Sequence, residues 1–121
     1  VLVLGGDGIG PEIAKQGLRV LQHLAELADI SIQIEEDLLH GSAWEAHGVF
    51  CTEAVLEKAK SVDAVLVGAV GGERWDNIRV PGGAEMQDGL MYLRYHLQTY
   101  LGLRPAQELF RQPSDRDSAR S

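Results

Sequence analysis

Two arginines in the second half of the chain are the residues best suited to bind a small acid. Arg94 follows Leu93, and Arg104 stands in the sequence Leu103-Arg-Pro-Ala106. A guanidinium group forms paired, charge-assisted hydrogen bonds with a carboxylate. The preceding segment, Asp63-Ala-Val-Leu-Val-Gly-Ala-Val-Gly-Gly-Glu-Arg-Trp-Asp76, is typical of a strand, a glycine turn and a tryptophan loop. This layout favours a nucleotide cofactor beside a multi-carboxylate substrate; the alternative is two ordinary surface arginines.

A second glycine-rich segment, Gly6-Asp-Gly-Ile-Gly10, follows a short apolar run and precedes a helical pattern. Glycines let the backbone approach a phosphate, and the first amides of a helix attract anions. The dinucleotide fingerprint is G-x-G-x-x-G, however, and here the third glycine comes one residue early and Pro11 removes an amide donor. The residues alone leave two alternatives: a small nucleotide-binding module that uses Glu36 for a ribose, or a tight turn without a ligand.

Strands and helices alternate along the segments that must position these residues. Strands are expected at residues 1–4, 30–36 and 64–68, with a further strand starting at 103 and running towards 110. Helices are expected at 11–28, at 53–60 after a Thr52 cap, and at 86–101. The apolar stripe of the first helix is Ile13, Gly17, Val20, Leu21, Leu24 and Ala28, and that of the last is Leu90, Leu93, Leu97 and Leu101. Residues 40–50 and 71–84 are expected to be irregular.

This alternation predicts an α/β fold with a mainly parallel sheet and flanking helices. Three or four strands are too few to complete such a sheet, so we expect an incomplete domain over residues 1–110 that aggregates or needs a partner. Residues 111–121 form a polar tail that we expect to be disordered.

Composition narrows the classes of partner. The net charge is −7 over 121 residues, which disfavours nucleic acid and anionic membranes. No apolar run is long enough to cross a bilayer, no signal peptide is apparent, and Cys51 is the only cysteine, so we expect a cytoplasmic protein. The four histidines show no metal-ligand spacing and are expected to be surface or partly packed residues, and we assign no metal to the scattered aspartates.

Taken in order, these motifs resemble a known family. Gly6-Asp-Gly-Ile-Gly-Pro-Glu12, the Asp63–Gly72 segment with Trp75-Asp76, then Leu93-Arg94 and Leu103-Arg-Pro-Ala106 are similar to the N-terminal part of the 3-isopropylmalate dehydrogenases. More broadly they resemble the isocitrate/isopropylmalate/tartrate dehydrogenase family. The resemblance covers roughly residues 1 to 110 and implies part of a two-domain α/β fold that differs from the standard Rossmann fold.

The resemblance implies an enzyme that oxidises and decarboxylates a 2-hydroxy acid of the 3-isopropylmalate type, with NAD and with Mg²⁺ or Mn²⁺, in a leucine-biosynthesis-like step. It implies that Arg94 and Arg104 hold substrate carboxylates, and that Leu90 and Met91 face the variable side chain of the substrate. Leu90 and Arg94 are four residues apart and share a helix face. The alternative for Leu90 is a place in the core.

The residues that border the cofactor, by the same resemblance, are Ile9, Gly72, Glu73, Arg74, Trp75, Asp76 and Gln87. For the loop the alternative is a surface segment in which Trp75 is a packing anchor. Gln87 departs from the family, which usually has an acid there. The catalytic residues, the metal ligands and most contacts of the family's homodimer are expected outside this chain. We therefore expect the chain alone to be inactive, and the remaining alternative is a truncated, non-catalytic remnant.

Overall fold

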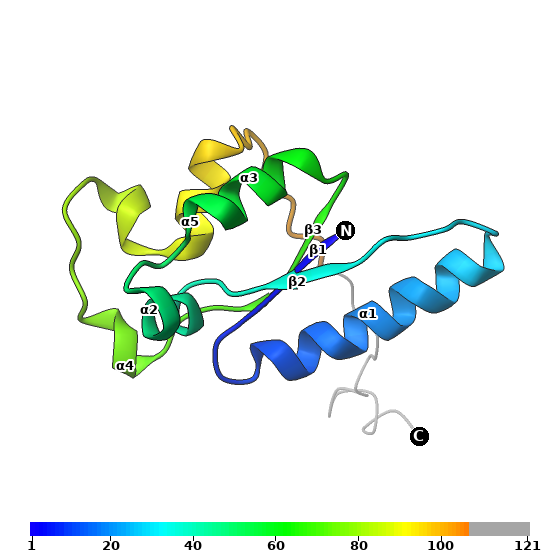
Figure 1. The fold of residues 1–121 in the computed structure, drawn as a ribbon, viewed down its shortest axis with the longest axis horizontal. Coiled ribbons are helices and arrows are strands. Elements are labelled where there is room, and N and C mark those ends of the chain that lie inside the picture. Colours follow the sequence, from blue (N-terminus) through cyan, green and yellow to red (C-terminus); the bar gives the residue numbers. More distant parts are fainter. Residues whose placement is uncertain (107–121) are drawn as a thin grey trace, which may run out of the picture.

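A three-stranded parallel sheet forms the centre of the protein. The computed structural model describes residues 1–106, and its strands lie in the order β2-β1-β3 (Figure 1). They comprise β1 (Leu2–Gly6), β2 (Glu35–Asp37) and β3 (Val65–Ala69). Leu2 of the central strand pairs with Glu35 on one side and with Val65 on the other. The predicted α/β class with a parallel sheet is confirmed.

Helices cover both faces of this sheet. The long helix α1 (Gly10–Leu27) lies against β1 and β3 on one face, whereas α3 (Glu53–Ser61) and α5 (Gly89–His96) lie on the other (Figure 1). Three short elements complete the described chain: α2 (Gly41–His47), α4 (Glu73–Asp76) and the 3-10 helix η1 (Ala84–Gln87). None of the described helices combines the length and the apolar character needed to cross a membrane.

Alternation along β1 divides its side chains between the two faces. Leu2 and Leu4 have no exposed surface and belong to the main core, which also takes residues from α3, α5 and the segment before α2. Its buried members are Leu2, Leu4, Leu39, Val55, Leu56, Ala59 and Leu93. The core therefore lies on the α3/α5 face, and it fixes the position of α5, which carries Arg94.

Three glycines bring α1 unusually close to the sheet. A Cβ at Gly10 would lie 2.2 Å from the carbonyl oxygen of Gly5, and a Cβ at Gly68 would lie 2.3 Å from the carbonyl oxygen of Gly10. Both neighbours are backbone atoms, which cannot turn away as a side chain can. The glycines at the end of β1, at the start of α1 and within β3 are thus required for backbone packing.

Several predicted elements are confirmed. The structure has strands at the first and third predicted positions and helices at 10–27 and 53–61, with the Thr52 side chain accepting a hydrogen bond from the Val55 amide at 3.2 Å. Residues 103–106 are not in a strand, and the rest of that predicted strand, like the predicted disorder of the tail, lies outside the described residues.

The predicted strand over 30–36 is wrong for most of its length. Only Glu35–Asp37 is a strand, and Ile30 is 60% exposed. The reason lies in the register: β1 begins at Leu2 opposite Glu35, so residues 30–34 have no strand beside them. The two segments expected to be irregular also contain helices: α2 has seven residues and α4 has four. Helices this short do not produce an apolar repeat that can be recognised in the sequence.

The predicted helix over 86–101 is shorter, and its stripe is only partly buried. Asp88 has extended backbone and caps α5, which ends at His96, and Gln98 follows with a φ of 55°. Leu93 is buried, whereas Leu101 is 65% exposed.

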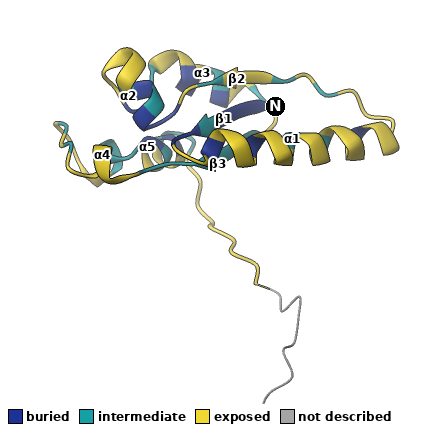
Figure 2. Ribbon diagram, turned by 90° about the horizontal axis from the view of Figure 1, so that it is seen from below, coloured by how far each residue is buried: buried dark blue, intermediate teal, exposed yellow. Residues whose placement is uncertain are grey.

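The stripe predicted for α1 is also misplaced. Ile13, Val20 and Leu24 are exposed, while the buried residues of this helix are the small ones, Gly10, Ala14 and Ala25. Most of α1 is exposed (Figure 2). Small side chains permit the close approach described above, so the larger ones lie on the flank of the helix.

Candidate functional site

The two arginines predicted to hold carboxylates line one open pocket of about 730 Å³ at the end of α5. Its lining residues are Glu85, Met91, Arg94, Tyr95, Thr99, Tyr100, Leu101, Gly102, Leu103 and Arg104. Neither guanidinium group forms an ion pair with any carboxylate in the described part of the chain. The pocket thus presents two cations and the apolar side chain of Met91 to a ligand, with Glu85 as the one acidic lining residue.

Leu90 is not a lining residue of this pocket. It is half-buried and packs against the main core. The structure therefore favours the core alternative for Leu90, and its contact with a substrate stays a prediction. Met91, one position further along the helix, is 46% exposed and lines the pocket.

The first turn of α5 is fixed from three directions. The Asp88 carboxylate accepts hydrogen bonds from the amides of Leu90 at 2.7 Å and Met91 at 3.0 Å. The Gly89 amide donates to Nδ1 of His40 at 3.1 Å. Gly89 has no room for a side chain, because a Cβ there would lie 2.7 Å from the carbonyl oxygen of Phe50. This rigid start determines which way the side chains of α5 point.

His40 is the histidine that the sequence analysis misjudged. It is 4% exposed, has a φ of 60°, and stacks on Phe50 with ring centroids 4.5 Å apart. Its Nδ1 accepts the Gly89 hydrogen bond, so the ring links the start of α2 to the start of α5. Its position just before Gly41 carries no periodic signal, and only the tertiary structure reveals the role.

The predicted cofactor loop begins at Gly72, and both Gly72 and the preceding Gly71 have conformations that other residues rarely adopt. Gly71 has a φ of 104° and Gly72 a φ of 148°. The indole of Trp75 lies against α2, where a Cβ at Gly41 would be 2.3 Å from its Cε2 atom. Trp75 is half-buried and is therefore a packing anchor, and its place at a cofactor site stays a prediction.

The charged residues of this loop connect it to α2. Arg74 forms a 2.7 Å ion pair with Glu45 of α2, and its guanidinium lies 5.8 Å from the centroid of the Trp75 ring. Glu73 and Asp76 are exposed. Ile9, at the tip of the turn before α1, is 64% exposed, so the predicted cofactor residues present accessible side chains from two neighbouring turns.

Asp7, to which the sequence analysis assigned no role, holds these turns together. It is 5% exposed, and its carboxylate accepts hydrogen bonds from the amides of Gly41 at 3.1 Å, Ser42 at 2.7 Å and Gly71 at 2.9 Å. The turn after β1, the start of α2 and the loop after β3 therefore meet at one carboxylate. An aspartate between two glycines gave a weak signal, because such residues are common in any turn.

Gln87 closes the far end of the loop. Its Oε1 accepts from the Val80 amide at 3.1 Å, and its Nε2 donates to the carbonyl oxygens of Val80 at 2.8 Å and Gly83 at 3.3 Å. A carboxylate at this position could accept the first bond but could not donate the other two. Glutamine is thus matched to this loop, while its contact with a cofactor stays a prediction.

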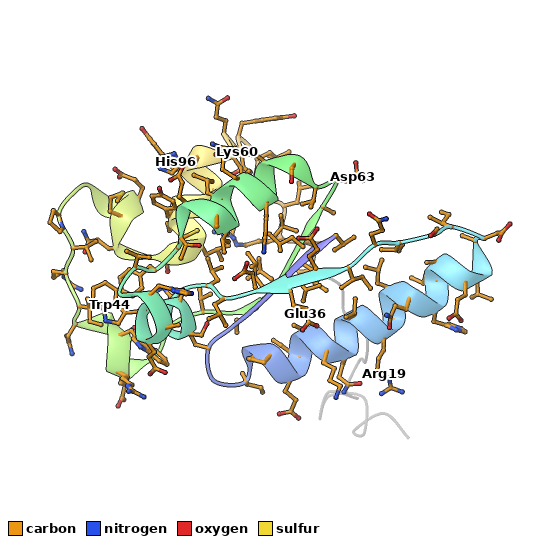
Figure 3. The ribbon with its side chains drawn as sticks, viewed as in Figure 1. Arg19, Glu36, Trp44, Lys60, Asp63 and His96 are labelled. Carbon is orange, nitrogen blue, oxygen red and sulfur yellow. The ribbon has the colours of Figure 1, made fainter. Side chains whose placement is uncertain are left out.

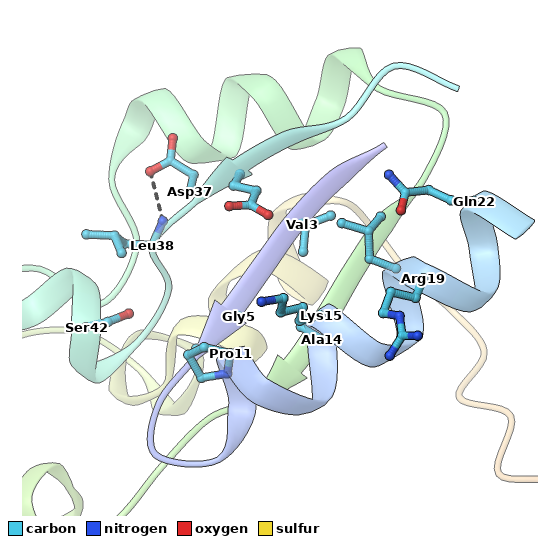
Figure 4. Close-up of a pocket in the computed structure, with 13 residues that line it drawn as sticks. Val3, Gly5, Pro11, Ala14, Lys15, Arg19, Gln22, Asp37, Leu38 and Ser42 are labelled. Atoms are coloured by element: carbon cyan, nitrogen blue, oxygen red, sulfur yellow. Dashed lines mark hydrogen bonds between the residues drawn. The ribbon is translucent and has the colours of Figure 1, made fainter. Parts of the chain in front are cut away.

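The glycine turn offers little space for a phosphate. Gly6 and Gly10 each lie against backbone atoms of Ala69, and a Cβ on Gly6 would be 2.0 Å from its carbonyl oxygen. A separate pocket of about 780 Å³ lies between α1 and β2 (Figure 4) and is lined by Lys15, Arg19, Glu36 and Asp37 among others. Of these lining residues, Arg19 comes from α1 and Glu36 from β2 (Figure 3). Its charges are mixed, which favours the tight-turn alternative over a dinucleotide site.

Several titratable groups have environments that shift their pKa, among them Cys51 and Asp37. Burial raises the pKa of the Cys51 thiol to about 11, and the charges of Asp37 and Glu53 add to this effect. Burial alone would raise the pKa of Asp37, but the 2.7 Å hydrogen bond and charge of Lys58 hold it below the ordinary value. Within residues 1–106, no three His, Cys, Asp or Glu side chains are grouped so that they could hold a metal ion.

Comparison with known proteins places this arrangement among dehydrogenases. The sequence pattern of the isocitrate/isopropylmalate dehydrogenase family matches residues 1–121. The chain is 44% identical over 115 residues to a 3-isopropylmalate dehydrogenase of Hydrogenovibrio crunogenus, covering 95% of this chain and 31% of the relative. It is 42% identical over 106 residues to that of Aquifex aeolicus, covering 88% and 29%.

A solved structure agrees in fold. The β-decarboxylating dehydrogenase of Thermococcus kodakarensis, in its apo form, superimposes with a TM-score of 0.55 at 25% identity, over 82% of this chain and 26% of that one. The chain thus spans about 30% of the length of the relatives it matches. With its parallel sheet, its two arginines at one pocket and these relatives, the chain belongs to the isocitrate/isopropylmalate dehydrogenase family.

Proposed function

We propose that this chain supplies the N-terminal part of the site of an enzyme that oxidises and decarboxylates a 2-hydroxy acid of the 3-isopropylmalate type, with NAD as the oxidant. The observation that carries the proposal is the pocket shared by Arg94, Arg104 and Met91. Family membership and the names of the relatives support it.

Each lining residue has a defined task in this proposal. Arg94 and Arg104 bind the substrate carboxylates, because two guanidinium groups on one pocket, neither paired with a carboxylate of residues 1–106, match two anionic groups. Met91 contacts the alkyl branch of the substrate. An apolar side chain accommodates an alkyl group but disfavours a third carboxylate at that position. Leu90 supports this helix from the core and is proposed to contribute to the same apolar contact. A fixed acid presents its C–H bond to the cofactor in one orientation.

The cofactor is proposed to lie along the turn that contains Ile9 and the loop from Gly72 to Asp76, with Gln87 at the loop's far end. Both turns lie at the carboxyl ends of β1 and β3, the usual ligand-binding edge of a parallel sheet. When bound, NAD accepts the hydride. Mg²⁺ or Mn²⁺ polarises the substrate oxygen in such reactions, and the described residues offer no donor set for it.

We further propose a cytoplasmic homodimer that acts in a leucine-biosynthesis-like step, and that residues 1–110 form one partial domain followed by a polar segment at 111–121. The isolated 121-residue chain is proposed to be inactive, because its described residues supply no group of side chains that could hold a metal ion.

The test uses a chimera in which residues 1–106 replace the matching segment of the Hydrogenovibrio crunogenus enzyme, with the 121-residue chain as a parallel sample. NADH formation is followed with isopropylmalate, D-malate, tartrate and isocitrate, each with Mg²⁺ or Mn²⁺. We expect turnover by the chimera alone, with isopropylmalate as the best substrate. A folded, dimeric chimera without turnover, or one that prefers isocitrate, would contradict the proposal.

Arginine variants of the chimera test the site itself. Arg94→Lys and Arg104→Lys keep the charge but lose the bidentate bonds, so each should raise the KM for isopropylmalate about tenfold or more. Arg19→Lys, on α1 and outside this pocket, is the matched control and should leave the KM unchanged. If all three variants had equal KM values, Arg94 and Arg104 could no longer be assigned to the binding of substrate carboxylates.

A further inference from the structure

Asp7 is the one carboxylate that is buried in the described part of the chain. It lies in the turn between β1 and α1, outside the arginine pocket. No described cation forms an ion pair with it. Its two oxygens are satisfied by backbone amides instead, and these come from segments 34 to 64 residues away in the sequence.

One of those segments is the start of α2. The N-cap residue of this helix, His40, makes no capping hydrogen bond with its side chain. Oδ1 of Asp7 accepts from the Ser42 amide and Oδ2 from the Gly41 amide, so Asp7 caps α2 from a distant part of the chain. Because Trp75 packs on Gly41, Asp7 also fixes the surface that holds the middle of the loop.

The other segment is the beginning of the loop itself. Oδ2 of Asp7 accepts from the amide of Gly71 at 2.9 Å, and Gly71 is the first of two successive glycines with φ values of 104° and 148°. Backbone in such sparsely populated conformations persists only where surrounding contacts determine it. The loop from 71 to 76 is thus held at its first residue by Asp7, and at Trp75 by the helix that Asp7 caps.

We propose that Asp7 is a positioning residue that holds the loop from 71 to 76 in its cofactor-binding conformation. The assignment of the cofactor to this loop rests on the proposed function. Asp7 lies beneath the loop and acts through it, so its loss weakens the binding of NAD while the arginine pocket on α5 keeps its affinity for the hydroxy acid. In this proposal the glycine turn affects cofactor binding through Asp7 and the loop. It does not require the glycines of the turn to contact a phosphate.

Asp7→Asn is the sharpest perturbation because it preserves size. An asparagine can place its oxygen towards Gly41 and Gly71, but its NH₂ group then faces the Ser42 amide, donor against donor. The flipped amide loses the other two bonds instead. Asp88→Asn is the matched control, since Asp88 also accepts two amides at a helix start, but on α5.

The first measurement is native-state amide hydrogen exchange of the chimera by NMR. Asp7→Asn should speed exchange about tenfold or more at Gly71 and at the Trp75 amide, which donates to Gly72, while Leu4 and Val55 in the core keep their rates. Asp88→Asn should leave Gly71 and Trp75 unchanged. Unchanged rates in Asp7→Asn would overturn the proposal. An equal acceleration at the core amides would also overturn it, because Asp7 would then stabilise the fold as a whole.

The second measurement is the kinetics of the chimera. Asp7→Asn should raise the KM for NAD about tenfold, with kcat and the KM for isopropylmalate close to their wild-type values, and Asp88→Asn should leave the KM for NAD unchanged. A loss of kcat without a change in the KM for NAD would overturn the proposal. A wild-type chimera without turnover would reject the proposed function, and the exchange rates would still decide whether Asp7 positions the loop.

Discussion

Replacing Gly10 by alanine tests whether the glycine turn is built for backbone packing. The new methyl group would lie 2.2 Å from the carbonyl oxygen of Gly5 and 2.6 Å from that of Ala69. Both oxygens belong to the ends of β1 and β3, so the helix must move away from the sheet by most of an ångström. Gly17→Ala is the matched control on the same helix, where the nearest atom is Cδ2 of Leu66 at 3.8 Å.

The expected free energies have opposite signs. Overpacking a rigid site costs about 1–3 kcal/mol, and contact with two immobile backbone oxygens places Gly10→Ala at the upper end of that range. The reduced entropy of the unfolded chain returns about 0.4–1 kcal/mol, so the net loss is about 2 kcal/mol. Gly17→Ala makes only an ordinary contact and should stabilise the helix by up to about 1 kcal/mol.

Urea unfolding of the 121-residue chain, followed by the fluorescence of Trp44 and Trp75, measures both changes. At a slope of about 2 kcal/mol per molar urea, Gly10→Ala should lower the midpoint by about 1 M and Gly17→Ala should raise it by up to about 0.5 M. Equal midpoints for the two variants, or a more stable Gly10→Ala, would refute the close-packing argument. The turn would then be free to serve another purpose, such as contact with a phosphate.

Three further predictions concern the loop, the thiol and the flank of α1. Gln87→Glu should lose the bonds donated to Val80 and Gly83, so proteolytic cleavage in residues 80–87 should become faster; an unchanged rate would contradict the amide pairing. Because folding raises the pKa of Cys51 from 9.0 to about 11, stability should be retained below pH 9 and fall as the pH rises from 9 towards 11, and a Cys51→Ser variant should lack this fall in its urea midpoint. Val20 and Leu24 are 60% and 55% exposed on α1, so the isolated chain should self-associate in sedimentation velocity and the double glutamate variant should not; equal sedimentation would show that another surface associates.

Much of the fold could be predicted because its signals are local. The run from Val1 to Leu4 and the glycines after it predicted β1, and Thr52 predicted the start of α3, since a buried strand and a helix cap each depend on a few neighbouring residues. The alternation of these elements was sufficient for the α/β class. The order of the motifs indicated the family, which the comparisons then showed.

Side-chain periodicity was less informative about which surface is buried. On α1 the large apolar residues Val20 and Leu24 dominate the pattern, yet the buried residues are Gly10, Ala14 and Ala25, and at Gly10 the helix lies too close to the sheet for any larger side chain. On α5 the pattern continued past His96, whereas the backbone conformation of Gln98 ended the helix there.

The sequence by itself determined the chemical types available to the site, namely the guanidinium groups of Arg94 and Arg104 and a tryptophan loop after a glycine turn. Only the tertiary structure placed both arginines on one pocket, and only it revealed Asp7 and His40 as the links between the turns. The physical reason is that hydrogen bonds between residues 34 to 64 positions apart depend on how parallel strands place their ends side by side, and neither composition nor periodicity records that distance.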